Sequence, residues 1–76
     1  MSLKPQPAKK VIKALSELGF KIVRKRGSHV VMKHADGRLT VIPVHAREEL
    51  GIGLLNKIIK DTGLPKEEFI ELLKTI

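Results

Sequence analysis

The segment from Ser28 to Val44, SHVVMKHADGRLTVIPV, determines the expected fold of this 76-residue chain. Two runs rich in β-branched residues flank Asp36-Gly37, and an Asp-Gly pair between such runs favours a two-residue hairpin loop. We therefore predict two antiparallel strands over residues 28–34 and 38–44. Pro43 lacks the N–H that a central strand needs, so the second of these strands is expected at a sheet edge.

The loop length also predicts which side chains share a face of the sheet. A two-residue loop places position 34 opposite 39, 32 opposite 41 and 29 opposite 44, and opposite residues share a face. The expected core face carries Val30, Met32, Leu39 and Val41. The other face carries His29, Val31, Lys33, Thr40, Ile42 and Val44. Because this second face is too apolar to be left to water, we expect a partner to cover it.

Further elements flank the hairpin on both sides. Apolar residues recur at helical spacing over 8–18, and Gly19 follows as a left-handed C-cap. Residues 20–24 alternate as another strand, which turns at Gly27. A second helix with apolar residues at 54, 55, 58 and 59 stops at Gly63, and Pro65 begins a third.

The resulting order, α-β-β-β-α-α, predicts an α+β domain with a three-stranded antiparallel sheet and its helices on one face. This topology resembles the double-stranded RNA-binding domain, although a fold alone does not give a function. We expect one domain over residues 1–76, in which residues 1–6 are flexible.

The positive charge of the chain is concentrated in its first half. The net charge is +7, and residues 1–38 hold ten Lys and Arg against two acids, whereas residues 39–76 hold five against six. Such a basic segment favours a polyanionic partner, because each phosphate that it neutralises releases condensed counterions. With Phe20 and Phe69 as the only aromatic residues, a membrane-surface helix and a base-stacking RNA platform are both disfavoured.

The cellular setting follows from two absences in the sequence. The chain has no cysteine, which excludes disulfides and thiolate metal sites. It also has no apolar run long enough to span a membrane, and its first residues lack the hydrophobic core of a signal peptide. We therefore expect a cytoplasmic protein without a membrane partner.

The stretch RKRGSHVVM, residues 24–32, is the candidate site. Arg24, Lys25 and Arg26 precede Gly27, Ser28 and His29. In a purely structural interpretation these cations form a solvated turn. In a functional one they hold RNA while His29 transfers protons, since histidine titrates near neutral pH and RNA supplies its own 2′-hydroxyl nucleophile. Further candidates for RNA contact are Lys33 and, on the first helix, Lys9, Lys10 and Lys13.

Two other kinds of site are not expected. A histidine metal site, for zinc or copper, would require His29 and His34 to converge, but they are predicted on opposite faces of one strand. A serine nucleophile would require Ser28 and His29 to face each other, whereas neighbours on a strand point apart. We expect His34 to face solvent near the hairpin.

Several blocks of the chain resemble the HicA, or YcfA-like, family of bacterial and archaeal toxins. The blocks are Leu15-Ser16-Glu17-Leu18-Gly19-Phe20, Arg24 to His29, Pro43-Val44-His45, Gly53 to Lys60 and Glu67-Glu68-Phe69. They extend from about residue 8 to 74, and Gly27-Ser28-His29 is the most specific of them. Where the family commonly has Gly-Thr-Leu, this chain reads Gly53-Leu54-Leu55.

This resemblance implies the toxin of a type II toxin–antitoxin system. Such a toxin would be a metal-independent endoribonuclease, or mRNA interferase, that needs no cofactor and is neutralised by a HicB-like antitoxin. The catalytic histidine maps to His29, and His45 takes an auxiliary role. The antitoxin would then cover the face with His29, Val31 and Ile42, and the free toxin is expected to be monomeric.

Two other functions remain open when the residues are considered alone. A non-catalytic RNA-binding module of the same fold would use the basic half and leave His29 without a role. An interaction protein could instead dock an acidic protein on its basic face, which only the charge pattern supports.

Overall fold

The structure, a computed structural model, describes residues 3–44 and 49–76. The elements are β1 (Gln6–Pro7), α1 (Ala8–Glu17), β2 (Phe20–Arg26), β3 (His29–His34), β4 (Leu39–Pro43), β5 (Glu49–Leu50), α2 (Ile52–Thr62) and α3 (Lys66–Lys74). This α+β arrangement contains the predicted helices and the predicted three-stranded antiparallel sheet. The role predicted for His45 lies outside the described residues.

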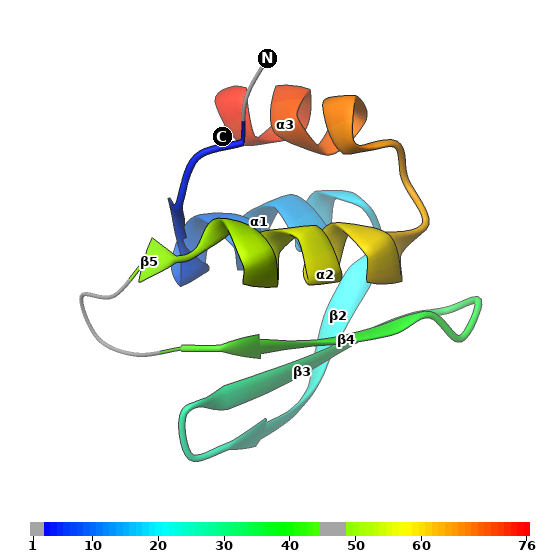
Figure 1. Cartoon of the computed structure of the whole chain (residues 1–76). Coiled ribbons are helices and arrows are strands. Elements are labelled where there is room, and N and C mark those ends of the chain that lie inside the picture. The colour runs from blue at the N-terminus through cyan, green and yellow to red at the C-terminus, as the bar shows by residue number, and fades with distance from the viewer. Residues whose placement is uncertain (1–2, 45–48) are drawn as a thin grey trace.

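The domain is built in layers, as Figure 1 shows. Strands β2, β3 and β4 form the sheet in that order, so β4 lies at an edge as Pro43 predicts. Helices α1 and α2 cover one face of the sheet, and α3 packs on these two helices. No helix in the described part of the chain covers the opposite face.

The hydrophobic core lies between the sheet and the first pair of helices. Helix α1 presents apolar residues at helical spacing and buries Val11 and Leu15 fully. From the sheet, Phe20 and Met32 meet them, with at most 2% of either side chain exposed. Gly63, at φ +74°, ends α2 in the left-handed conformation that lets the chain turn back toward α3.

The β3–β4 hairpin differs from the sequence-based expectation by one residue. Its loop has three residues, 35–37: the His34 N–H donates to the Arg38 carbonyl at 2.8 Å, and the Gly37 N–H donates to the His34 carbonyl at 2.9 Å. Gly37 has φ +100°, the left-handed conformation typical of a three-residue loop. An Asp-Gly pair suits this loop as well as the two-residue one, which explains the wrong prediction.

The shifted register reverses the predicted faces of β4, because a slip of one residue turns every side chain of a strand over. Val30 pairs with Ile42, which is fully buried, so the expectation that Ile42 lies on the uncovered face was wrong. Thr40, expected on the same uncovered face, is 1% exposed and donates its hydroxyl to Asp61 Oδ2 at 2.9 Å. Leu39 and Val41, expected in the core, lie on the uncovered face instead, and Leu39 is 49% exposed.

The first described residues are packed against the domain. Leu3 belongs to the core at 7% exposure, and Gln6 of β1 pairs with Leu50 of β5. Residues 3–6 thus make packing and pairing contacts with the domain, and the flexibility of residues 1–6 stays a prediction. The pairing partner lies more than forty positions along the chain, so no local sequence signal indicates it.

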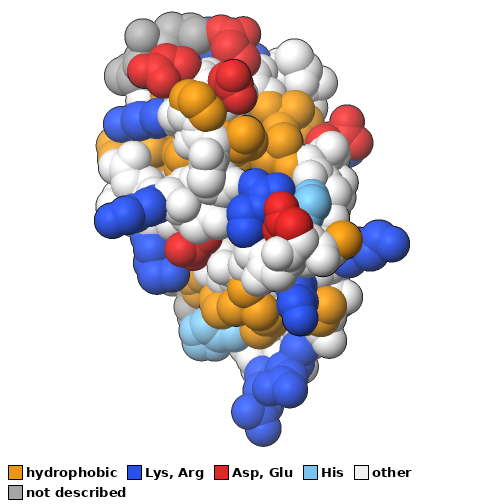
Figure 2. Space-filling model, turned by 90° about the vertical axis from the view of Figure 1, so that its right-hand side faces the viewer, with side chains coloured by type: hydrophobic (Ala, Val, Ile, Leu, Met, Phe, Trp, Pro, Cys, Tyr) orange, Lys and Arg blue, Asp and Glu red, His pale blue; other side chains and the backbone are white. Residues whose placement is uncertain are grey.

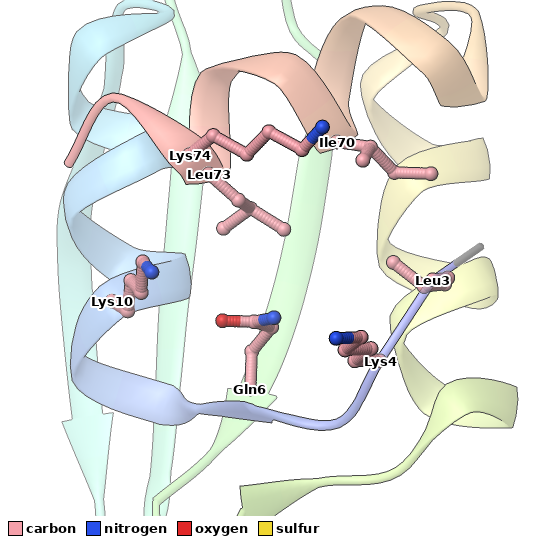
Figure 3. A pocket seen from close by; sticks show the side chains of 7 residues that line it. All are labelled: Leu3, Lys4, Gln6, Lys10, Ile70, Leu73 and Lys74. Carbon is pink, nitrogen blue, oxygen red and sulfur yellow. The ribbon is translucent and has the colours of Figure 1, made fainter. Parts of the chain in front are cut away.

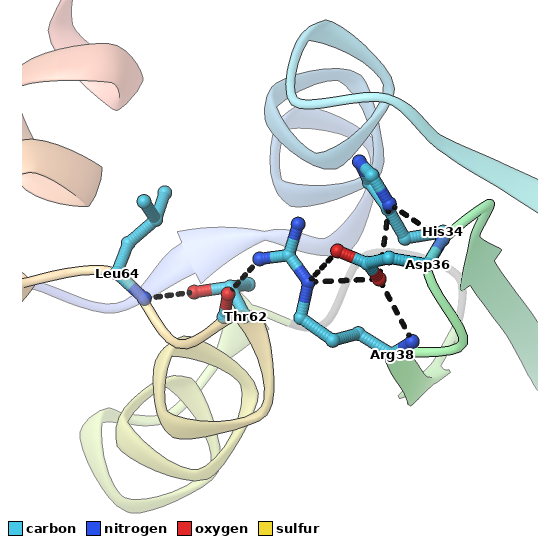
Figure 4. A network of polar contacts seen from close by, with 5 residues as sticks. All are labelled: His34, Asp36, Arg38, Thr62 and Leu64. Carbon is cyan, nitrogen blue, oxygen red and sulfur yellow. Dashed lines mark hydrogen bonds and ion pairs between the residues drawn. The ribbon is translucent and has the colours of Figure 1, made fainter.

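A polar cluster joins the 35–37 loop to the end of α2, as Figure 4 shows. The Arg38 guanidinium donates through Nε to both carboxylate oxygens of Asp36, at 3.1 and 2.8 Å, and through Nη1 to the Thr62 carbonyl. It also lies 5.4 Å from the centre of the Phe20 ring. The hydrogen bonds that the Arg38 side chain and the Arg38 backbone N–H donate to Asp36 lower the pKa of Asp36 from 3.8 to about 2.

His34 belongs to this cluster and does not face solvent as expected. Its ring packs edge-on against Phe20 at 5.3 Å, and 23% of its side chain is exposed. The Nδ1 atom lies 3.1 Å from the Asp36 backbone nitrogen and 3.0 Å from Asp36 Oδ1. The Asp36 N–H donates a hydrogen bond to Nδ1, which ties the His34 ring to the loop.

Candidate active site

An extra residue in β2 determines which cations lie beside His29. Ile22 pairs with Met32 and Arg24 pairs with Val31, which leaves Val23 without a partner on β3. One residue added to one strand of an antiparallel pair is a β-bulge. In an unbroken strand, Arg24 would share the face of Ile22; beyond the bulge it lies on the opposite face.

The uncovered side of the sheet, called the open face below, is a grid of nine residues in three rows. The rows are Lys21, Lys33 and Leu39; Arg24, Val31 and Val41; and Arg26, His29 and Pro43. Along β2 the open face is cationic, and along β4 it is apolar. Together with Val23, residues of the first two rows line a shallow hollow.

His29 begins β3 at the end of the open face and is exposed. It pairs with Arg26 on one side and with Pro43 on the other. The tight turn before it depends on Gly27, whose φ of +54° is left-handed. The Ser28 carbonyl accepts a hydrogen bond from the Val44 N–H, which ties the turn to the end of β4. The backbone on both sides of His29 is therefore held in place.

The three consecutive cations do not share one face. Arg24 and Arg26 lie on the open face, whereas Lys25 pairs with the buried Val30 and so lies on the opposite face. All three side chains are exposed. Figure 2 shows Lys and Arg side chains at the lower tip of the molecule, with hydrophobic side chains and a histidine just above.

The lysines of α1 lie away from His29. Helix α1 packs on the opposite side of the sheet from the open face, so the exposed Lys9 and Lys13 do not share a face with His29. Lys10 is half-buried at the rim of a pocket between the N-terminal segment and α3, as Figure 3 shows. The structure thus separates the predicted RNA-binding residues into two groups on opposite sides.

The described residues contain no group of three or more His, Asp and Glu side chains that could hold a metal ion. His29 and His34 lie on opposite faces of β3, as strand alternation predicts. Independence from metal remains a prediction. Across residues 3–44 and 49–76, no helix is long and apolar enough to cross a membrane.

Sequence reasoning missed Lys21, Leu39 and Val41 as members of the open face. Lys21 lies opposite Lys33, and the alternation of residues 20–24 gave no sign of the bulge that brings Arg24 to the same face. Leu39 and Val41 were missed because the loop is longer by one residue. The signal that could have found them is Gly37 read as the last residue of a three-residue loop.

The fold and this site together define a class of protein. It is a domain like the double-stranded RNA-binding domain, with an exposed histidine on a basic sheet face. A family model described as "HicA toxin of bacterial toxin-antitoxin" matches residues 8–64 of the 76-residue chain. The chain therefore belongs to the HicA toxin family, as the resemblance predicted, and this membership implies an antitoxin partner. No curated protein matches the chain closely enough to be compared with it.

Proposed function

We propose that this toxin is a metal-independent endoribonuclease that cleaves mRNA on the open face, with His29 as the proton-transfer group. The observation that carries the proposal is the position of His29, exposed and cross-strand to Arg26 on a face that no described helix covers. A histidine held between a cation and a rigid turn suits proton transfer next to a bound phosphate.

The chemistry requires nothing beyond the chain, the RNA and water. His29 takes the proton of a 2′-hydroxyl, the P–O2′ bond forms, the P–O5′ bond breaks, and the 5′-oxygen takes a proton from water. The protonated His29 then gives its proton to the hydroxide that remains, which restores the water molecule and the histidine base. The products are a 2′,3′-cyclic phosphate and a 5′-hydroxyl end. Positive charge beside His29 neutralises the negative charge that builds up on the non-bridging phosphate oxygens.

The antitoxin, which we propose to be HicB-like, binds the open face and so covers His29. The support is the apolar column of β4, where Leu39 is 49% exposed beside half-buried Val41. An apolar strip next to a row of cations fits a partner with an apolar patch and acidic neighbours. In this proposal the free toxin is a cytoplasmic monomer, and mRNA and the antitoxin compete for one surface.

The test is the His29→Ala variant of the full chain. General acid–base groups typically contribute about 10²- to 10⁴-fold in rate, so cleavage of RNA and growth arrest in cells should both be lost. Thermal melts should match the wild type, because the side chain is exposed. If folded His29→Ala still cleaves RNA, the catalytic role of His29 is refuted. If both proteins bind RNA and neither cleaves it, the domain is a non-catalytic RNA-binding module.

A further inference from the structure

We propose that the β-bulge at Val23 divides the labour among the three consecutive cations. Arg26 contacts the scissile phosphate beside His29, Arg24 holds a neighbouring phosphate of the same strand, and Lys25 takes no part in catalysis. This inference rests on the proposed ribonuclease function. It goes further because the sequence presents the three cations as equivalent, whereas the pairing of β2 with β3 separates them.

The pairing of β2 with β3 sets the position from which each cationic side chain extends. Arg26 lies directly opposite His29, and side chains of opposite residues start about 4.5 to 5.5 Å apart. A long side chain that begins so close can reach the same phosphate as the imidazole. Lys25 lies opposite Val30, whose side chain is 7% exposed in the core, so it projects toward the helix side of the sheet.

Arg24 lies one row further along the open face, opposite Val31. Residues two apart on a strand are about 6.5 Å apart, which is on the scale of neighbouring phosphates along one RNA strand. The cations of β2 on the open face therefore form a row along which an RNA backbone can bind, and this row ends beside His29. Within the described residues, neither Arg24 nor Arg26 forms an ion pair that would compete with phosphate.

The chemistry of the side chains supports the same assignment. The arginine fork donates two parallel hydrogen bonds to phosphate oxygens, which a lysine ammonium cannot do. Donors aimed at the oxygens of a developing phosphorane stabilise the transition state more than the bound RNA. Arg26 is the arginine that the register puts within reach of those oxygens, and Arg24 is placed to bind.

The experiment compares Arg24→Gln, Arg26→Gln and Lys25→Gln, each of which removes one positive charge from adjacent positions. Single-turnover cleavage of an RNA oligonucleotide gives the rate at saturating protein, and binding to the same RNA is measured on a His29→Ala background. Removal of one donor at such a site typically costs about 10²- to 10³-fold in rate, so Arg26→Gln should show a loss of that size. Arg24→Gln should raise Kd severalfold and leave the saturated rate nearly unchanged. Lys25→Gln should leave the rate within about twofold.

Arg26→Lys separates charge from geometry. It keeps the positive charge and loses the fork, so it should recover only part of the rate that Arg26→Gln loses. Equal rate losses in Arg26→Gln and Lys25→Gln, in folded proteins that still need His29, would overturn the division of labour while leaving the proposed function intact. If cleavage does not depend on His29 at all, the proposed function fails, and this inference fails with it.

Discussion

Truncating Ile42 and Leu39 to alanine tests the hairpin register on which the whole open face depends. Both substitutions remove three carbons from the same strand, β4, so the chemistry of the change is matched. Ile42 is fully buried and Leu39 is 49% exposed. The register found here therefore predicts that Ile42→Ala is the more costly change, whereas a two-residue loop predicts the reverse.

The magnitudes are large enough to decide the question. A buried Ile→Ala change costs about 2 to 5 kcal/mol, through lost hydrophobic transfer and the cavity left behind. Leu39 already has half its side chain in water, so Leu39→Ala should cost about 1 kcal/mol or less. A domain of this size is stable by only about 4 to 11 kcal/mol in total.

The assay is urea unfolding followed by circular dichroism, with a thermal melt of each variant. A loss of 1 kcal/mol lowers the Tm of a domain this small by about 4 to 8 °C, so Ile42→Ala, at about 2 kcal/mol or more, should lower it by at least about 8 °C. Ile42→Val, at about 0.5 to 1.5 kcal/mol, keeps the comparison measurable if Ile42→Ala does not fold. The reasoning is refuted if Leu39→Ala is as destabilising as Ile42→Ala or more so.

Three further predictions address the polar cluster, the bulge and the chemistry. Asp36→Asn should lower the Tm at neutral pH, and its difference in Tm from the wild type should shrink as the pH falls from about 4 toward 2. The reason is that a carboxyl whose pKa is lowered on folding stabilises the fold only while it is ionised. The control is Glu17→Gln, which removes an exposed carboxylate outside the cluster, and a pH-independent difference in Tm for Asp36→Asn would contradict the prediction. Deleting Val23 should remove the bulge while keeping Arg26 opposite His29, so cleavage that needs His29 should persist in a protein that still folds; its loss from a folded variant would show that the bulge has another role. Cleavage by the purified toxin should continue in excess EDTA, and an activity restored only by magnesium or zinc would disprove the metal-free mechanism.

Local sequence patterns placed most of the fold correctly. The apolar period of residues 8–18, the turn glycines and Pro65 located the helices, because helix faces and caps depend on residues a few positions apart. The facing of β3 was also right, with Val30 and Met32 inside and His29 outside. The Gly27-Ser28-His29 block indicated the family, which the match over residues 8–64 confirms.

The sequence by itself thus determined the three helices, the three strands of the main sheet and the family, and it singled out His29 as the candidate site residue. The tertiary structure decided which residues surround His29. One additional residue in the 35–37 loop buried Ile42 and exposed Leu39, and one unpaired residue, Val23, placed Arg24 and Arg26 on the face that carries His29. The physical reason is the two-residue period of a strand, in which a shift of one position reverses the face of every side chain that follows. Such shifts are settled by long-range pairing and by the packing of the whole sheet against α1 and α2, which no local pattern of residues records.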